Sequence, residues 1–226
     1  MLAVEGLNAW HGQAQALFDV HLAVGEGELV VIQGLNGAGK STLLQSLIGI
    51  GPRAQGRIAW QGQPIEGWPA HRRARSGLGF VAEDRRLFTA LSVKENLWIA
   101  AKTMAPAGAN SIQQETPAQR CDRILTLFPQ LKAMLHRPAS QMSGGEQQML
   151  ALARTLMTGP RLLLLDEPCE GIAPVLVVAM RDALLQLGRE GVAMLVAEQN
   201  NILAHHAQRV LLLSSGRIDT SVKSLA

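Results

Sequence analysis

Residues 28–44 read E-L-V-V-I-Q-G-L-N-G-A-G-K-S-T-L-L. The first part, up to Gln33, is a short β-branched run typical of a buried strand, and the last part begins a helical pattern. Between them, G-L-N-G-A-G-K-S-T at 34–42 matches the pattern G-x-x-x-x-G-K-[ST]. A chance match is rare in this strand–loop–helix context, so we expect a loop that binds the phosphates of a nucleotide, called here the phosphate loop.

The residue types of the phosphate loop suit an anion. Its glycines let backbone N–H groups turn toward the phosphates, and the helix N-terminus adds partial positive charge. Lys40 is expected to reach the β- and γ-phosphates of ATP, and the Ser41 hydroxyl to coordinate Mg²⁺. The predicted nucleotide-binding residues of this loop are Gly34, Leu35, Asn36, Gly37, Ala38, Gly39, Lys40, Ser41 and Thr42.

A second apolar run, L-L-L-L at 162–165, ends in Asp166 and Glu167. Ligands of parallel α/β sheets bind at the carboxyl ends of the strands, so both carboxylates are expected beside the phosphates. Asp166 would hold Mg²⁺, directly or through water, and Glu167 would polarise the attacking water. Alone, an acidic pair after a strand is more often a solvated helix cap. The phosphate loop reverses that preference.

The segment M-S-G-G-E-Q-Q at 142–148, called here the signature segment, connects these motifs to a known family. It resembles the signature motif of the ATP-binding cassette (ABC) ATPases, which usually reads L-S-G-G-Q. Its position about twenty residues before the run at 162–165 is also that of the family. The resemblance implies a partner, a second ABC ATPase subunit, whose γ-phosphate the segment would cap. The residues implied in this contact are Ser143, which would cap the following helix, Gly144, Gly145 and Glu146.

The resemblance covers nearly the whole chain and implies an α/β fold. That fold has a P-loop NTPase (RecA-like) core, an antiparallel β-subdomain and a helical ABC signature subdomain. The chain would form a single ABC ATPase domain over 1–226. The core and β-subdomain are expected at about 1–83 and 155–226, and the helical subdomain at about 84–154, where strand signals are weak. Strand and helix patterns then return at 162–165, 174–190, 192–197 and 210–213.

The composition limits the class of protein. A chain of 226 residues with 47% hydrophobic residues can bury a sizeable core. A net charge of +3 is too small to argue for nucleic acid, and the basic stretch at 71–75 is expected to be a solvated helix face. No apolar run is long enough to cross a bilayer, and no signal peptide is visible. Cys121 and Cys169 lack metal-ligand spacing, which favours a reduced, cytoplasmic protein.

Three positions depart from the commonest ABC pattern. Where the family usually has a glutamine that touches Mg²⁺ and senses the membrane partner, this chain has Glu83. Gln199 replaces the usual catalytic histidine, and His205 lies too far along the chain to reach the same phosphate. The stretch after Pro168 lacks the aspartate that many members carry. The predicted catalytic residues are Glu167, Gln199 and Glu83, and the predicted metal ligands are Ser41, Asp166 and Glu83.

The combination is similar to one branch of the family, the ATPase subunits of importers for branched-chain amino acids and for urea or amides. Those proteins tend to show E-Q-N, matched at 198–200, and E-G-[IL]-x-P, matched at 170–174. They also tend to show an acidic residue followed by R-R-x-F, matched at 84–88. The resemblance implies a motor subunit bound to permease subunits at the cytoplasmic face of the inner membrane. A periplasmic solute-binding protein would be an indirect partner.

Two other functions stay open from the sequence. A soluble ABC ATPase acting on ribosomes or DNA needs no permease, but such proteins generally carry two cassettes or a long coiled-coil insertion. An exporter motor, such as one for lipopolysaccharide, fits the size but is expected to keep the histidine that Gln199 replaces. The transported solute cannot be read from a subunit that does not touch it.

The residue that stacks on adenine is open between two neighbours. ABC ATPases usually place an aromatic ring there, and the position 23 residues before Gly34 is His11. Trp10 offers the larger ring, and successive strand residues face opposite ways, so one of the two is expected to stack. We take His11 as the candidate because of its position.

The segment 83–88 also carries an expectation about the permease. In the family this region helps to form a groove that receives a short permease helix, and an apolar side chain beside two arginines suits such a groove. Phe88 is therefore expected to contact the permease. The alternative is that Leu87 and Phe88 only anchor the core of the helical subdomain.

Overall fold

The computed structural model describes residues 1–102 and 115–219. Parts of both expected subdomains, 103–114 and 220–226, lie outside the described residues. The central sheet contains the parallel strands β3 (Leu29–Gln33), β6 (Leu78–Val81), β7 (Leu162–Asp166), β8 (Ala193–Glu198) and β9 (Arg209–Ser214). A short antiparallel strand, β10 (Arg217–Asp219), extends it, and the strand order is β10-β9-β3-β8-β7-β6.

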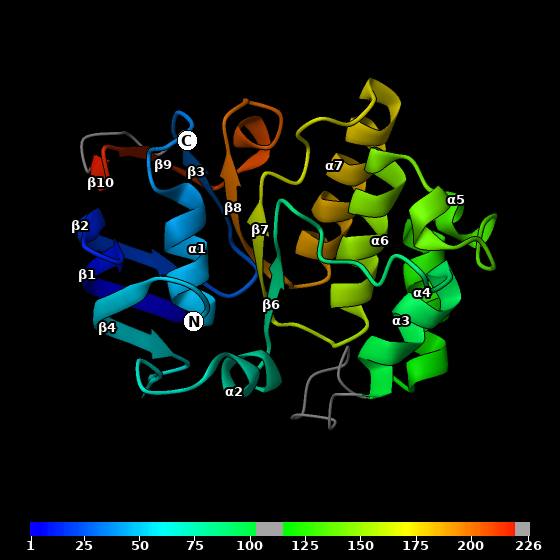
Figure 1. The fold of residues 1–226 in the computed structure, drawn as a ribbon, viewed down its shortest axis with the longest axis horizontal. Helices are drawn as coiled ribbons and strands as arrows, with labels where there is room; N and C mark the ends of the chain where they lie inside the picture. Colours follow the sequence, from blue (N-terminus) through cyan, green and yellow to red (C-terminus); the bar gives the residue numbers. More distant parts are fainter. Residues whose placement is uncertain (103–114, 220–226) are drawn as a thin grey trace.

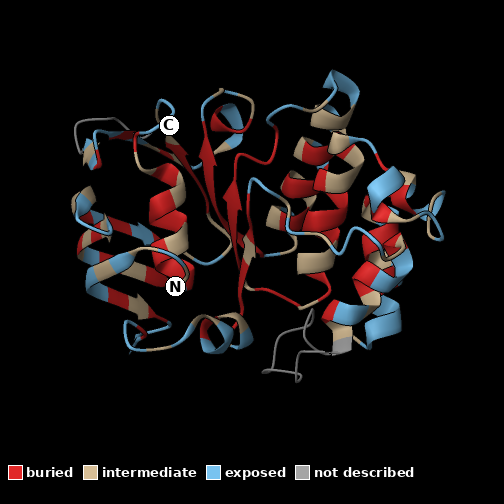
Figure 2. Cartoon of the chain, in the orientation of Figure 1, coloured by how far each residue is buried: buried red, intermediate tan, exposed pale blue. Residues whose placement is uncertain are grey.

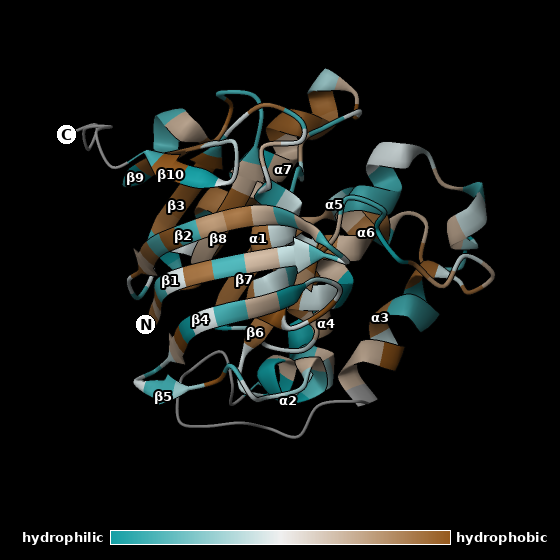
Figure 3. Cartoon of the chain, turned by 60° about the vertical axis from the view of Figure 1, so that its left-hand side comes forward, coloured by the Kyte–Doolittle hydropathy of each residue, from teal (hydrophilic) through white to brown (hydrophobic). Residues whose placement is uncertain are grey.

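A second sheet is antiparallel and lies to one side of the first (Figure 1). Its strands are β1 (Leu2–His11), β2 (Ala14–Val24), β4 (Arg53–Trp60) and β5 (Gln63–Pro64), in the order β2-β1-β4-β5. The helix α1 (Lys40–Ile48) lies between the two sheets (Figures 1 and 3). This sheet therefore covers the helix that follows the phosphate loop.

The remaining helices mostly cover the other face of the central sheet. They are α2 (Ala70–Arg75), α3 (Val93–Lys102), α4 (Pro117–Leu127), α5 (Pro129–Lys132), η2 (Ala139–Gln141), α6 (Gly144–Leu156), α7 (Pro174–Arg189) and η3 (Ala204–His206). From α3 to α6 they fall between β6 and β7, where the helical subdomain is expected. Its boundaries stay a prediction. No helix in the described ranges combines the length and the apolar character needed to span a bilayer.

Side chains of the central sheet alternate between two hydrophobic clusters. Leu162 and Leu164 of β7 pack with α1 and the antiparallel sheet, whereas Leu163 and Leu165 pack with α6 and α7. Parallel strands are buried on both faces, which explains why this run reads as four consecutive leucines. Figure 2 shows that most residues of the central strands are buried. Each buried leucine contributes about 1.5–3 kcal/mol to the stability of this arrangement.

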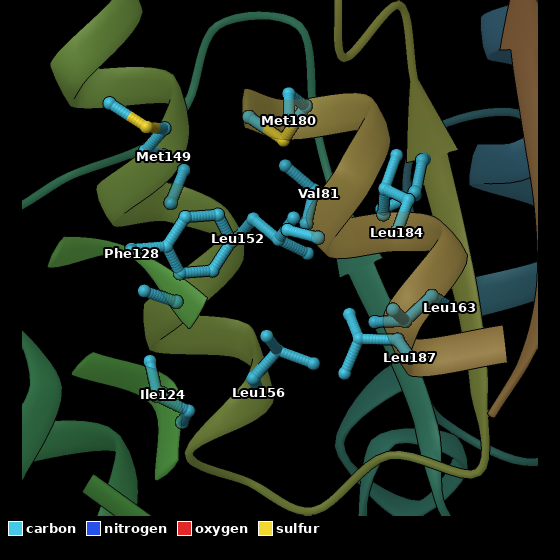
Figure 4. Packing of buried hydrophobic residues seen from close by; sticks show 14 of the residues in the cluster. Val81, Ile124, Phe128, Met149, Leu152, Leu156, Leu163, Met180, Leu184 and Leu187 are labelled. Atoms are coloured by element: carbon cyan, nitrogen blue, oxygen red, sulfur yellow. The ribbon is translucent and has the colours of Figure 1, made fainter. Parts of the chain in front are cut away.

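The helical layer packs on the sheet through one continuous core (Figure 4). Phe128 lies against α6 beside Met149 and Leu152, and Met180 and Leu184 of α7 join the same cluster. These side chains are buried. The core connects the signature segment, at the start of α6, to β7, which carries Asp166.

The basic stretch at 71–75 is not simply a solvated face, so that prediction is wrong for Arg73. Arg73 is buried, and its Nη1 donates to Ser46 O at 2.9 Å and to Leu47 O at 2.8 Å. These carbonyls belong to the last turn of α1, where a cation is favoured by the helix dipole. Arg73 therefore fixes α2 to the end of α1.

Candidate nucleotide-binding site

The phosphate loop adopts a conformation that requires glycine. Gly37 and Gly39 have φ of 82° and 107°, in the left-handed region. A Cβ at Gly39 would lie 2.9 Å from Leu17 Cδ2 and 3.1 Å from Ala16 O, so no larger residue fits. Because Gly39 has no side chain to cap α1, the first-turn N–H groups stay available to an anion.

Lys40 is already held in place by the loop around it. Its side chain is buried, and Nζ donates to Gly34 O at 2.8 Å and to Leu35 O at 3.3 Å. Nζ also lies 3.0 Å from Glu167 Oε1. The structure thus brings together the residue expected to bind phosphate and the residue expected to activate water.

Asp166 meets the phosphate loop at the end of β7. Ser41 Oγ donates to Asp166 Oδ1 at 3.0 Å, and Asp166 is 2% exposed. Burial raises the pKa of Asp166 to about 6, and the charges of Glu167 and Glu83 add to this effect. The Ser41 hydrogen bond and the charge of Lys40 oppose it. A cation at this carboxylate would favour its ionised form.

The donor set here fits Mg²⁺. Ser41 and Asp166 offer hard oxygen atoms, and Glu83 lines the same pocket. Mg²⁺ in nucleotide sites is held by one or two carboxylates together with phosphate oxygens and water. No cluster of three or more His, Cys, Asp or Glu suited to a metal occurs in the described residues, and such a site does not need one.

Two adjoining pockets open over the phosphate loop. The larger has a volume of about 390 Å³ and is lined by His11, Ala16, Asn36, Gly37, Gly39, Lys40, Ser41, Thr42, Glu83, Glu167 and Glu170. The smaller is lined by Ser41, Gln45, Ala82, Glu83, Asp84, Arg86 and Asp166. Glu83 and Ser41 lie where the two pockets meet, so a nucleotide in the larger one would place its phosphates beside the predicted metal ligands.

The structure separates the two candidates for the adenine contact. His11 lines the larger pocket, and its Nε2 lies 3.0 Å from Thr42 Oγ1. Trp10 does not line that pocket, and the Arg53 guanidinium lies 4.8 Å from the centre of its ring. Trp10 is thus engaged with Arg53 of β4 in the antiparallel sheet, and the contact of His11 with adenine stays a prediction.

Gln199 is not brought into either pocket. It is exposed after β8, and it is absent from the described residues that line the two pockets. The residues after it are tied to the start of the phosphate loop, because Gln33 Nε2 donates to Asn201 Oδ1 at 2.5 Å and to Asn200 O at 3.4 Å. Its predicted contact with the γ-phosphate therefore stays a prediction.

The signature segment forms the expected helix start, but away from these pockets. Ser143 Oγ accepts from Glu146 N at 3.4 Å, and Glu146 Oε2 accepts from Ser143 N at 2.7 Å, which makes a capping box. A Cβ at Gly145 would lie 2.5 Å from Leu176 Cδ1 and 3.2 Å from Ile172 Cβ, so a side chain there would displace the Leu176 side chain of α7. Among the described residues that line either pocket, none belongs to 143–146.

Two residues near the site escaped the sequence reasoning. Glu198 is a buried carboxylate at the end of β8, and the sequence marked it only as part of the E-Q-N at 198–200, without a role in the site. Arg85 links the segment after Glu83 to the start of α6. Its guanidinium donates to Gln148 Oε1 at 3.1 Å and to Gln147 Oε1 at 3.3 Å.

Comparison with known proteins agrees with this site. A family model described as ABC transporter matches residues 17–170. The chain is 42% identical to the high-affinity branched-chain amino acid transport ATP-binding protein BraG of Pseudomonas aeruginosa, over 96% of this chain and 91% of that protein. It is 34% identical to the probable branched-chain amino acid transport ATP-binding protein LivF of Archaeoglobus fulgidus, over 96% of this chain and 90% of that protein.

A solved structure gives the same result for the fold. The ADP conformation of an ATP-binding cassette of an ABC transporter matches with a TM-score of 0.80 at 25% identity, over 97% of this chain and 89% of that one. The expected α/β cassette fold is confirmed by this match and by the two-sheet architecture. The chain therefore belongs to the ABC transporter family of ATP-binding cassettes.

Proposed function

We propose that this chain is the ATP-hydrolysing motor subunit of an ABC importer for branched-chain amino acids, or for urea or amides. The observation that carries the proposal is the likeness to BraG and LivF over 96% of the chain, because both proteins are named for branched-chain amino acid transport. The E-Q-N at 198–200 and the segment at 84–88 support the same branch. ATPase activity itself comes with the family.

In this proposal the residues around Lys40 have different roles in binding and hydrolysing ATP. The phosphate loop and Lys40 bind the β- and γ-phosphates, and His11 lies against the nucleotide base. Glu167 accepts a proton from water as the water oxygen attacks the γ-phosphorus, and ADP leaves with the electrons of the broken P–O bond. Ser41, Asp166 and Glu83 would hold Mg²⁺, whose charge would neutralise the phosphate oxygens.

A second cassette completes the site. The capped start of α6 offers N–H groups to an anion, yet residues 143–146 are absent from the described residues that line the pockets of their own chain. We infer that the signature segment of one subunit closes on the γ-phosphate of the other. The partner is either a second copy of this chain or a different ABC ATPase subunit.

The other partners follow from the importer role. The subunit binds two permease subunits at the cytoplasmic face of the membrane, as a peripheral protein. A periplasmic solute-binding protein acts on it indirectly, through the permease. Nucleic acid is not a partner, since the net charge of +3 gives no strong positive field.

Reconstitution tests this proposal. The chain is co-expressed with the permeases whose genes neighbour its own, and ATP hydrolysis is measured in proteoliposomes with the neighbouring solute-binding protein. Leucine, urea and glutamate are compared as solutes, and the Lys40→Ala complex serves as the inactive control. Stimulation by leucine or urea but not glutamate supports the proposal. Failure to co-purify with the permeases, or stimulation by glutamate alone, would overturn it.

A further inference from the structure

Glu167 has a strained backbone for a residue with a side chain. Its φ is 47°, in the left-handed region that favours glycine. Such a conformation costs free energy and persists only where the surroundings fix it. The turn that begins at Glu167 must therefore be held by its neighbours.

Two consecutive residues of β8 hold this turn. Ala197 O accepts from Glu167 N at 2.9 Å, and Glu198 Oε1 accepts from Cys169 N at 3.2 Å. Within the turn, Glu170 N donates to Glu167 O at 3.2 Å. The first anchor is an ordinary backbone contact between neighbouring strands. The second needs the side chain of Glu198.

Burying the carboxyl group of Glu198 at this position costs free energy. It is 1% exposed, and its Oε2 has no hydrogen-bond partner in the described part of the chain. Burial, more than any neighbouring charge, raises the pKa of Glu198 to about 7. An apolar side chain would avoid this cost, since the rest of β8 is apolar. Stability alone does not explain a carboxyl group at this position.

We propose that Glu198 is a positioning residue for hydrolysis: by accepting the Cys169 N–H, it fixes the turn that sets the Glu167 carboxylate beside Lys40. The inference rests on the proposed role of Glu167 as the general base. Glu198 does not touch the reacting atoms. It acts through the turn, and the feature that matters is an oxygen acceptor at Oε1 rather than a negative charge.

Three variants distinguish the need for an oxygen acceptor at this position from the need for a negative charge. Glu198→Leu removes the acceptor at similar volume, whereas Glu198→Gln keeps an amide oxygen that can accept the same N–H. Glu28→Leu is the matched control, because Glu28 Oε2 accepts Gly25 N at 2.6 Å in a turn at the opposite end of β3. Glu167→Gln is measured alongside to test the general base itself.

The expected result is a loss of turnover without a loss of ATP binding. Misplacing a catalytic group by about 1 Å costs up to 10²-fold, so we expect Glu198→Leu to lower kcat by about 10- to 100-fold with KM within about twofold. Glu198→Gln should restore kcat to within about threefold of the wild type. Glu28→Leu should leave kcat unchanged.

Each other outcome counts against the inference. Unchanged kcat in Glu198→Leu, while Glu167→Gln is inactive, overturns the role of Glu198 alone. A Glu198→Gln variant as slow as Glu198→Leu overturns the acceptor role in favour of the charge. Normal turnover in Glu167→Gln overturns the general-base assignment instead. If Glu198→Leu does not fold, Glu198→Ser replaces it, because serine is polar but too short to reach the Cys169 N–H.

Discussion

Lys40 Nζ lies 3.0 Å from Glu167 Oε1, and the two side chains are only 4% and 8% exposed. This buried ion pair joins the phosphate loop to the turn after β7. The phosphates of ATP and the Glu167 carboxylate would therefore compete for one cation. If Lys40 binds phosphate and Glu167 activates water as proposed, this pair would couple binding to hydrolysis, since a phosphate that attracts Lys40 would also free a carboxylate oxygen for water.

The first prediction concerns Glu167→Gln. An amide cannot accept the proton of water, so turnover should fall by about two to four orders of magnitude. ATP affinity should be kept or rise a few-fold, because a carboxylate that competes for Lys40 is gone. Hydrolysis assays and equilibrium binding of ATP check this. Lys40→Ala should instead lose ATP binding, and near-normal turnover in Glu167→Gln would remove Glu167 from its role.

The second prediction concerns Gln199→His. A neutral amide can hydrogen-bond a phosphate but cannot carry the positive charge of a protonated imidazole. We expect the homodimer of this chain to hydrolyse ATP slowly and the substitution to raise the rate by about tenfold or more. Gln199→Asn is the matched control, which should not raise it. The prediction is wrong if the wild-type homodimer hydrolyses ATP as fast as histidine-bearing cassettes that are measured in the same assay.

The phosphate loop and the carboxyl end of β7 were predictable because each depends on local sequence. Glycines with φ of 82° and 107° leave few alternatives at 37 and 39, and four leucines in a row require burial on both faces. These local rules predict the strand–loop–helix unit and the Asp166–Glu167 pair, whereas the cassette fold as a whole was implied by the resemblance to the ABC ATPases.

Contacts between distant segments were not predictable in this way. Arg73 looks like one residue of a basic surface, and only the packing of α2 on α1 shows that it is buried. Gly145 looks like a glycine for anion binding, and only the structure shows that a Cβ there would meet the Leu176 side chain of α7. Glu198 likewise gains its partner, Cys169, from another strand's turn.

The third prediction concerns the dependence of stability on pH. The pKa of Glu198 is raised from 4.5 to about 7 in the folded chain, mainly by burial. The unfolded chain then holds fewer protons between these values, so the free energy of unfolding falls as pH rises toward 7 and levels off above it. Asp166, raised from 3.8 to about 6, acts with the same sign at lower pH.

Thermal unfolding of the wild type and Glu198→Gln at pH 5, 6, 7 and 8, without nucleotide or Mg²⁺, checks this. The amide does not titrate, so the variant should gain stability relative to the wild type as pH rises, by about 1–3 kcal/mol in total. Parallel stability profiles for the two proteins would contradict the raised pKa of Glu198.

The last prediction concerns the expected contact with the permease. We expect Phe88 to make this contact and Leu87 to stabilise the core of the subunit. Phe88 is 48% exposed, with the Arg154 guanidinium 5.4 Å from the centre of its ring, whereas Leu87 packs against the hydrophobic core. The backbone of Phe88 is fixed, because Asn96 Oδ1 accepts from its N–H at 3.1 Å and Asn96 Nδ2 donates to its carbonyl at 3.0 Å. A held backbone that presents an exposed aromatic ring suits a protein contact.

Phe88→Ala should therefore change the stability of the isolated subunit by less than about 1 kcal/mol, because little buried surface is lost. It should leave ATP hydrolysis by that subunit intact, yet greatly reduce co-purification with the permeases. Leu87→Ala is the matched control and should do the reverse, with a loss of about 1–3 kcal/mol and normal permease binding by the folded fraction. Thermal unfolding and co-purification of the two variants distinguish a residue that contacts the permease from a residue that packs in the core. Unchanged permease binding in Phe88→Ala would place the docking surface elsewhere on the cassette.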